Sequence, residues 1–436
     1  MDLTIVLNII GIPALMLIAW SVSANRKVIN WRVIGWGLIL ELIVALIVFV
    51  IPIGTQLFLV VNDVVNNVLE SANYGTYFVF GKLAIGPGSV SASGETSIGF
   101  ILAFQGLAVI IFFAALVGIL YYTGIMGKVM KVFSYIFSKL MGISGAESLS
   151  SASSIFVGVE AGLVIKPYIN KMTRSELNTI LTVGMSTIAS SMLAVYITIL
   201  KGSFPNIAGH LVSASIMNVP AAIIMSKILC PETDTPETIG QKAVMNYEKE
   251  GSLFEAIINN ANAGLRLAVG IVTLLLAVLG LMALSDKILI LAGSYVNDLF
   301  SINIDWTLKG LLGYIFYPLT LLIGIPVNDA WQASKIIGER LILTEVTAFQ
   351  DLAIQLNSVS PMLPRSAVMV TYALTGFAHV ASIAIFVGGY IALAPSRIKE
   401  FSSLSFRALL GATLACLLTA AIAGLFFTNN SILLGQ

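Results

Sequence analysis

The chain contains stretches of apolar sequence long enough to cross a lipid bilayer, and this feature limits its fold more than any other. A membrane-spanning helix needs about 20 mostly apolar residues, because in hydrocarbon every backbone polar group must find a partner within the protein. Such runs lie near residues 4–22, 33–53, 98–123, 177–200, 206–229, 262–285, 361–394 and 406–427. We therefore expect an all-α, polytopic membrane protein with about eight transmembrane helices.

The composition agrees with a membrane bundle. Of 436 residues, 58% are hydrophobic and only 10% are charged, whereas about 25% of the residues in a soluble domain are charged. The net charge of +1 gives no indication of a nucleic-acid partner. The two cysteines, Cys230 and Cys416, and the two histidines show no disulfide or metal-ligand spacing, so we expect no metal and no cofactor. The N-terminus lacks the basic start of a secretory signal, and residues 4–22 are interpreted as a retained first span.

Basic residues in the short loops predict the orientation of the chain. Those that follow the first and third spans, and those around the start of the eighth, fall on one side if both termini lie outside. They are Arg26, Lys27, Arg32, Lys128, Lys131, Lys139, Arg397, Lys399 and Arg407. The positive-inside rule makes that side cytoplasmic, together with the polar stretch 231–252. Residues 310–325 are also apolar, but counting them as a span would move the last basic cluster outside, so we interpret them as an interfacial arm. Residues 56–70 are interpreted as a further interfacial helix.

Two carboxylates lie in apolar surroundings at corresponding places in the chain. Glu160 lies in the stretch 153–161, and Glu345 lies in the stretch 341–349. A carboxylate near the middle of a bilayer costs about 2.5 to 3.5 kcal/mol on insertion scales, so it is retained mainly where it faces a polar cavity or a partner. The pair therefore indicates a transport site.

Both carboxylates occur within the same order of elements, which predicts an inverted repeat. Residues 133–144 resemble residues 312–319. Each of these arms precedes a re-entrant hairpin with one of the glutamates, then a long helix interrupted by small polar residues at 185–192 or 375–382, then another helix. The charge pattern makes the two hairpins enter from opposite faces, as in transporters whose broken helices meet near the midplane. Small polar residues in membrane helices also serve close packing alone, and that alternative stays open for each residue taken singly.

This order divides the chain into four parts. Residues 1–126 hold the N-terminal spans, mainly scaffold, and residues 127–229 form the first repeat. Residues 230–307 hold a cytoplasmic loop, a scaffold span and an external segment, and residues 308–436 form the second repeat.

Other functional classes fit the sequence less well. An intramembrane hydrolase would need a nucleophile with its base or a metal-binding histidine pair, and the sequence contains no recognisable motif of either kind. The chain is therefore predicted not to be an enzyme. Two acids without a neighbouring arginine argue against an anionic substrate. An ion-coupled secondary transporter for a small neutral polar solute remains the expectation.

Several motifs resemble the concentrative nucleoside transporter family. Residues 155–177 are similar to its first hairpin and exit, residues 344–349 to its second hairpin, and residues 372–382 to its second broken helix. Further similarities lie at 73–81, 103–105, 110–113 and 145–148, so that the resemblance covers most of the chain from about 60 to 390. It implies a homotrimer in an inner or plasma membrane that imports nucleosides by alternating access, driven by Na⁺ or H⁺. Each protomer would have a static scaffold and a moving transport domain.

The resemblance also implies which residues contact the substrate. In that family the first hairpin lies at the base, while the second hairpin and the broken helix lie at the ribose. Carried over, Glu345 would accept hydrogen bonds from ribose hydroxyls, and Phe377 would give a flat apolar surface. His379 stands where the family has asparagine, and the first hairpin is one residue shorter and lacks the amide that reads the base. The substrate-contacting positions are Gly158, Val159, Glu160, Glu345, Phe377, His379 and Ser382.

The same resemblance gives a candidate ion site. The family's Na⁺ site uses a side-chain amide, a hydroxyl and backbone carbonyls, which correspond here to Ser154, Val157, Ser191 and Met192. Ser154 replaces the amide, as in proton-coupled bacterial members, and this favours H⁺ over Na⁺. The candidate proton carriers are Glu160, Glu345 and His379, because buried carboxylates and histidines form the usual relays in pumps and transporters.

Overall fold

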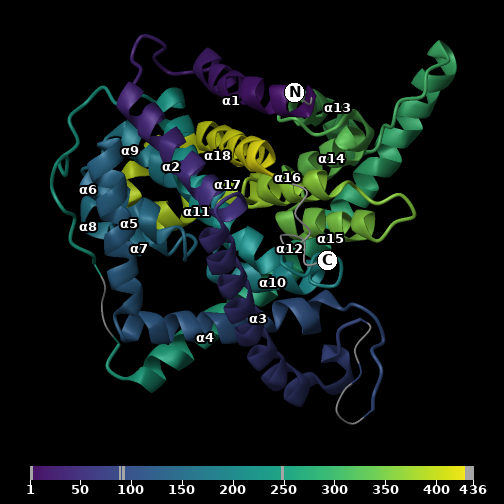
Figure 1. The fold of residues 1–436 in the computed structure, drawn as a ribbon, viewed down its shortest axis with the longest axis horizontal. Helices are drawn as coiled ribbons and strands as arrows, with labels where there is room; N and C mark the ends of the chain where they lie inside the picture. The colour runs from purple at the N-terminus through teal and green to yellow at the C-terminus, as the bar shows by residue number, and fades with distance from the viewer. Residues whose placement is uncertain (1–2, 88–89, 91–93, 247–249, 428–436) are drawn as a thin grey trace.

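A computed structural model describes the chain except residues 1–2, 88–89, 91–93, 247–249 and 428–436 (Figure 1). The described part is helical, with a single isolated β-bridge. Seven helical segments within it are long and apolar enough to cross a membrane. They comprise α1 (Leu3–Ser21), α2 (Trp31–Phe49), the π-helical turn η2 (Ala103–Leu107) with α4 (Val109–Tyr122), α9 (Arg174–Ser186) with α10 (Ser190–Leu200), α11 (Ile207–Leu229), α12 (Leu253–Phe300), and α18 (Ile398–Phe426) with the short η3 (Pro395–Arg397) before it.

The eighth predicted span, 361–394, is divided into α16 (Pro364–Leu374) and α17 (Val380–Leu393). This agrees with the expected broken helix. The prediction of an all-α membrane fold is therefore confirmed, and both predicted interruptions occur: one between Ser186 and Ser190, the other between Leu374 and Val380.

The first repeat follows the predicted order of arm, hairpin, broken helix and helix. Its arm is α5 (Ile125–Met141), and its hairpin consists of α6 (Gly145–Ser153), α7 (Ala161–Val164) and α8 (Lys166–Ile169); the broken helix α9/α10 and helix α11 follow. Capping boxes fix where two of these helices begin. The Ser144 hydroxyl accepts a hydrogen bond from the Glu147 amide at the start of α6, and Thr173 does the same for Glu176 at the start of α9.

The second repeat has the same order. Its arm is α13 (Leu308–Leu322), its hairpin consists of α14 (Val327–Arg340) and α15 (Glu345–Leu356), and α16, α17 and α18 complete it. The arm is too short to span, as predicted, and it begins where the Thr307 hydroxyl accepts a hydrogen bond from the Gly310 amide at 2.9 Å. Each hairpin thus brings one of the two singled-out glutamates to its tip.

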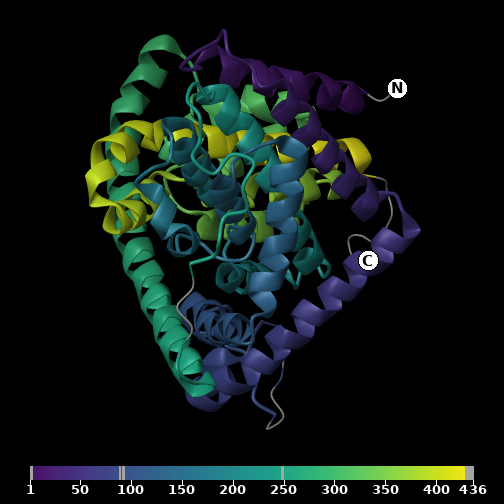
Figure 2. The ribbon, with the colours of Figure 1, turned by 90° about the vertical axis from the view of Figure 1, so that its left-hand side faces the viewer.

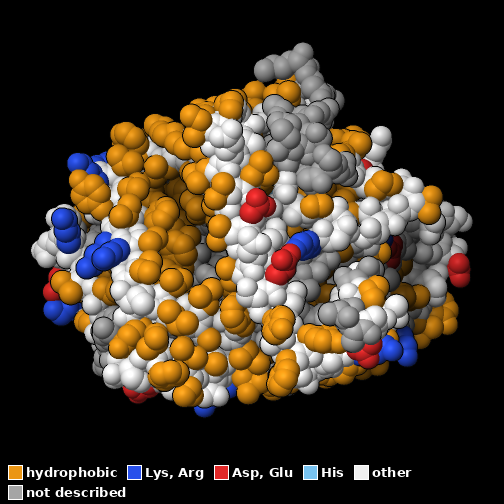
Figure 3. All heavy atoms as spheres, turned by 60° about the horizontal axis from the view of Figure 1, so that its bottom comes forward, with side chains coloured by type: hydrophobic (Ala, Val, Ile, Leu, Met, Phe, Trp, Pro, Cys, Tyr) orange, Lys and Arg blue, Asp and Glu red, His pale blue; other side chains and the backbone are white. Residues whose placement is uncertain are grey.

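Two long helices flank this bundle, α3 (Pro52–Phe80) and α12 (Figure 2). The prediction for α12, residues 262–285, was too short, because polar residues such as Asn260 and Asp286 lie just beyond both ends of the predicted range. Its 48 residues correspond to about 72 Å, more than twice the hydrocarbon thickness of about 30 Å. Apolar side chains cover much of the outer face that Figure 3 shows, as expected for a surface that meets lipid or another subunit.

The loops predicted to be cytoplasmic come together at one end of the bundle. Arg32 at the start of α2 donates to the Lys139 carbonyl at 2.7 Å, at the end of α5. Arg397 donates to the Asn170 carbonyl at 2.8 Å, at the end of α8. This convergence agrees with the orientation that the basic residues predict.

The two helix interruptions meet in the middle of the molecule. An interrupted helix leaves carbonyl groups without intrahelical partners, and these must be satisfied inside a membrane protein. The Asn218 side chain on α11 donates to the carbonyl of Ser186 at 2.8 Å and also to the carbonyl of Thr375. A single amide therefore connects the end of α9 to the end of α16.

We predict that Gly376→Ala destabilises the protein at this crossing. A Cβ atom at Gly376 would lie 2.7 Å from the Ser186 carbonyl oxygen, which is backbone that cannot move aside cheaply. Overpacking of this kind costs about 1 to 3 kcal/mol, so the melting temperature of the purified protein should fall. Gly388→Ala on α17 is the control, because a Cβ there meets nothing within 4 Å. Equal melting temperatures for the two variants would contradict the crossing.

Candidate functional site

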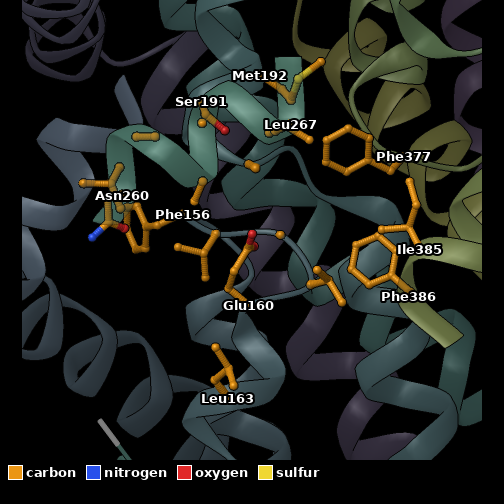
Figure 4. Close-up of a pocket in the computed structure, with 18 of the residues that line it drawn as sticks. Phe156, Glu160, Leu163, Ser191, Met192, Asn260, Leu267, Phe377, Ile385 and Phe386 are labelled. Carbon is orange, nitrogen blue, oxygen red and sulfur yellow. The ribbon is translucent and has the colours of Figure 1, made fainter. Parts of the chain in front are cut away.

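The hairpin tips and helix interruptions line one cavity of about 510 Å³. The tip of the first hairpin (156–160), the start of α15 and the residues before α17 form one wall, and α4 and α12 form the opposite wall. Pockets of about 300 to 1,000 Å³ suit small organic ligands. Figure 4 shows Glu160 pointing into this space, between Phe156 on one side and Phe377 and Phe386 on the other.

Glu345 is the buried acid of the site. It is the first residue of α15, where the helix dipole favours a negative charge, and only 3% of its surface is exposed. Its Oε1 accepts a hydrogen bond from the Tyr196 hydroxyl at 2.6 Å, and its Oε2 lies 3.0 Å from His379 Nε2. Tyr196 is itself held by stacking on Phe349, with ring centroids 4.5 Å apart. The carboxylate is therefore fixed in position at the cavity wall.

His379 has two functions at this point. It is the N-cap residue of α17, and its Nδ1 accepts a hydrogen bond from the Ser382 amide at 3.1 Å. An accepting Nδ1 carries no proton, so in the neutral ring the proton is on Nε2, the nitrogen that faces Glu345. The histidine thus caps a helix, as an asparagine could, and also presents an N–H to the acid.

Ser382 is buried beneath this cap. Its hydroxyl donates to the carbonyl of His379 at 2.6 Å, and no part of the residue is exposed. It does not belong to the cavity lining, unlike the other six positions predicted to contact substrate. Its contact with the cavity is indirect, through the position of His379.

The two glutamates have different environments. Glu160 at the tip of the first hairpin is exposed toward the cavity, whereas Glu345 is almost completely buried. Gly158 and Val159 precede Glu160 along the same wall, and the tip is tied to α10 because the Ser190 amide and hydroxyl donate to the Phe156 carbonyl at 3.0 and 2.6 Å. The site therefore offers one fixed carboxylate and one that is free to adjust to a ligand.

The candidate ion positions lie close to this tip. Val157, Ser191 and Met192 line the cavity, and Ser154 is buried just behind them. The Ser154 hydroxyl donates to the Ser150 carbonyl at 3.0 Å. Among the described residues no group of three or more His, Cys, Asp or Glu side chains is arranged to hold a metal ion.

The sequence did not single out Tyr196 or Asn218, although both hold the site together. Each is a polar residue within a strongly apolar span, which is the signal that identified the two glutamates. A search for every isolated polar residue in the spans would have found both. Asn260 lines the cavity from α12, but it precedes the predicted span 262–285 and such a search would have missed it.

Three family profiles together match most of the chain. The profile described as "Na+ dependent nucleoside transporter C-terminus" matches residues 210–424, the corresponding N-terminal profile matches residues 10–83, and a "Nucleoside recognition" gate profile matches residues 103–203. The chain is 37% identical to an uncharacterized transporter of Haemophilus influenzae, over 97% of this chain and 98% of that one. It is 33% identical to the nucleoside permease NupC of Helicobacter pylori, over 97% and 98%.

The chain belongs to the concentrative nucleoside transporter family. Solved structures agree with this assignment. The transporter CNTnw in an inward-facing, substrate-bound state matches with a TM-score of 0.88 at 31% identity, over 98% of each chain. A variant of CNTnw in an outward-facing state matches with a TM-score of 0.86 at 30% identity, also over 98% of each. Concentrative nucleoside transporters are multi-pass membrane proteins and not enzymes, which confirms both expectations from the sequence.

We predict that the capping function of His379 can be separated from its contact with Glu345. In His379→Asn the shorter amide can still cap α17, whereas in His379→Leu the cap is lost, at about 1 kcal/mol. The melting temperature should therefore fall further for His379→Leu than for His379→Asn, while both variants lose the Nε2 contact. If the two variants melted at the same temperature, the cap would not contribute to stability.

Proposed function

We propose that the protein imports nucleosides across a cell membrane by alternating access, coupled to a cation gradient. The observation that carries the proposal is the fixed carboxylate of Glu345, which lies at the meeting point of a hairpin tip and a broken helix within a cavity of nucleoside size. Membership of the nucleoside transporter family supports the substrate class, and relatives with solved inward-facing and outward-facing states support the mechanism.

The chemistry of the cavity suits the two parts of a nucleoside. Glu345 Oε2 lies 3.0 Å from His379 Nε2, and a carboxylate oxygen has two lone pairs, so it can also accept a hydrogen bond from a ribose hydroxyl. The aromatic rings of Phe156, Phe377 and Phe386 line the rest of the wall and can contact a flat base. We infer that the ribose lies toward α15 and α17 and the base toward the tip of the first hairpin.

The base-reading side of the site differs from the family pattern. The first hairpin presents Val159 and Glu160 where the family has an amide, and Glu160 is exposed toward the cavity. A carboxylate accepts hydrogen bonds from exocyclic amino groups but cannot donate to a base carbonyl when ionised. We therefore infer a preference for bases that present N–H donors on this edge.

We favour H⁺ as the coupling ion. Ser154 offers a shorter hydroxyl in place of the amide ligand, and it is buried behind the cavity lining. Glu345 and His379, in contrast, form a buried ionisable pair 3.0 Å apart at the substrate position. Protonation of this pair would neutralise a buried negative charge while the substrate binds. The family description names Na⁺, so Na⁺ is the alternative that an experiment must exclude.

A transporter for another small neutral polar solute is the second candidate function. The carboxylate of Glu345 would bind any vicinal diol, and the cavity volume does not by itself require a base. The three phenylalanine rings favour the nucleoside, because a simple polyol gains little from aromatic walls.

We also infer a homotrimer in an inner or plasma membrane. The homotrimer follows from the family resemblance in the sequence. It agrees with the length of α12 and with its outward apolar side chains, such as Leu276 and Leu291, which are exposed in the single chain. Burial of such surface against neighbouring subunits would stabilise the assembly.

Glu345→Gln should abolish uptake of radiolabelled uridine or adenosine into proteoliposomes while the protein still folds. The amide removes the negative charge and half of the acceptor capacity at the fixed position, and loss of a charged hydrogen bond costs about 1.5 to 3 kcal/mol. Glu70→Gln is the control, since that acid forms an exposed ion pair with Lys201 on the surface. Normal uptake by Glu345→Gln would contradict the assignment of Glu345 as the residue that binds the ribose. Competition by non-nucleoside solutes would identify the second candidate function.

An imposed pH gradient, acid outside, should drive nucleoside accumulation in proteoliposomes without Na⁺, whereas an imposed Na⁺ gradient at equal pH should not. A difference of one pH unit supplies about 1.4 kcal/mol per proton, so one proton per cycle supports accumulation of about tenfold for each pH unit imposed. Accumulation driven by Na⁺ alone would assign the coupling ion to Na⁺ and would point to Val157 and Ser191 as ligands.

A further inference from the structure

A second cavity of about 330 Å³ lies away from the substrate site. It is enclosed by α1, the start of α2 and the end of α11, and its walls are mostly apolar, including Met16, Leu17 and Ile34. Two tryptophans, Trp20 and Trp31, also line it. The substrate-binding chemistry described above uses none of these residues.

The position of this cavity relative to the membrane follows from its residues. Its lining on α1 runs from Pro13 to Trp20, a depth of about 10 Å along the helix. Trp31 is 72% exposed and Leu17 is 61% exposed, so both side chains face the bilayer. Tryptophan is enriched at the boundary between hydrocarbon and headgroups. The cavity therefore reaches from the headgroup boundary into the hydrocarbon of one leaflet.

Positive charge lies beside the opening. Arg26 and Lys27 are exposed in the loop between α1 and α2, and the Arg26 guanidinium is 5.7 Å from the centre of the Trp20 ring. The loop is anchored, because the Ala24 amide donates to the Leu229 carbonyl at 2.9 Å. Arg32 is already engaged with backbone carbonyls of α5. One guanidinium N–H of Arg26 donates to the Ser21 carbonyl, which leaves the other guanidinium donors and the Lys27 ammonium for an anion at the level of the headgroups.

We propose that this cavity binds an anionic glycerophospholipid of the cytoplasmic leaflet. One acyl chain occupies the apolar cavity between α1 and α2, and the phosphate of the headgroup lies against Arg26 and Lys27. The two parts of the site match the two parts of such a lipid, and basic pockets between helices on the cytoplasmic side are suited to anionic headgroups. A soluble anion could bind the basic loop but would leave the apolar cavity unoccupied.

The lipid would contact a residue that holds the first hairpin in place. Lys227 on α11 lines the cavity, and its Nζ lies 2.7 Å from Glu147 Oε1 and 3.0 Å from Ser175 Oγ. Glu147 belongs to α6, the first helix of that hairpin, and Ser175 belongs to α9. An acyl chain packed along the Lys227 side chain would therefore stabilise the base of the hairpin whose tip lines the substrate cavity.

The test is a lipid titration of the purified full-length protein in detergent, followed by melting temperature and by native mass spectrometry. Phosphatidylglycerol should raise the melting temperature and remain bound, while phosphatidylcholine of the same chains should do so much less. Arg26→Gln/Lys27→Gln should weaken phosphatidylglycerol binding about 30-fold, since each basic residue near an anionic surface contributes about fivefold. Lys128→Gln/Lys131→Gln is the matched control, because it removes two exposed charges from α5 on the same predicted face and should bind normally.

A second variant tests the apolar half of the site. Leu17→Trp places a larger side chain in the cavity at an exposed position, so it should fold normally and should lose phosphatidylglycerol binding. Glycerol phosphate alone should produce no shift. The proposal is overturned if phosphatidylcholine stabilises equally, if glycerol phosphate alone reproduces the shift, or if both cavity and loop variants bind phosphatidylglycerol as the unaltered protein does.

Discussion

The structure depends on how two interrupted helices satisfy their backbone groups inside a membrane. Each interruption leaves carbonyl groups that water cannot reach, and an unsatisfied group there costs several kcal/mol. The Asn218 side chain serves both interruptions at once, by donating to Ser186 and Thr375. Because one amide joins the two repeats, separating the interruptions would leave both carbonyl groups unsatisfied. The hairpin tips that pack beside the interruptions meet at one cavity.

The chemistry of that cavity follows from the same crossing. Helix α17 restarts after its interruption with His379 as the cap, and α15 begins at Glu345, so the two helix N-termini lie side by side. Both termini favour negative charge, and the Tyr196 hydroxyl donates to the same carboxylate. The buried acid is thereby held in place by Tyr196 at one carboxylate oxygen and by His379 at the other.

The sequence predicted the fold and much of the site because both depend on strong local signals. Apolar length identified the spans, and the isolated acids Glu160 and Glu345 identified the hairpin tips. The extent of α12 could not be predicted, since polar residues such as Asn260 and Asp286 lie on either side of its most apolar part. The burial of Ser382 and the tautomer of His379 also could not, because both depend on the geometry of a cap that forms only when α17 restarts.

The two walls of the cavity differ in polarity, and this difference affects how easily one wall could slide past the other. The hairpins, the interruptions and α11 are joined by buried hydrogen bonds, so they would move as one body. The opposite wall is mostly apolar, with Ala114, Val117 and Leu267 among its side chains, and sliding past such residues breaks few directional contacts.

Hydrogen bonds that would oppose such sliding occur between α3 and the start of α11. There the Asn62 side chain donates to Asn206 Oδ1 at 3.2 Å and accepts from the Gly209 amide at 3.2 Å. A buried hydrogen bond contributes about 1 kcal/mol net when it is exchanged for another partner, but more when a partner is left unsatisfied. Sliding of α11 past α3 would break these two hydrogen bonds, so this contact opposes the movement more than the apolar wall of the cavity does.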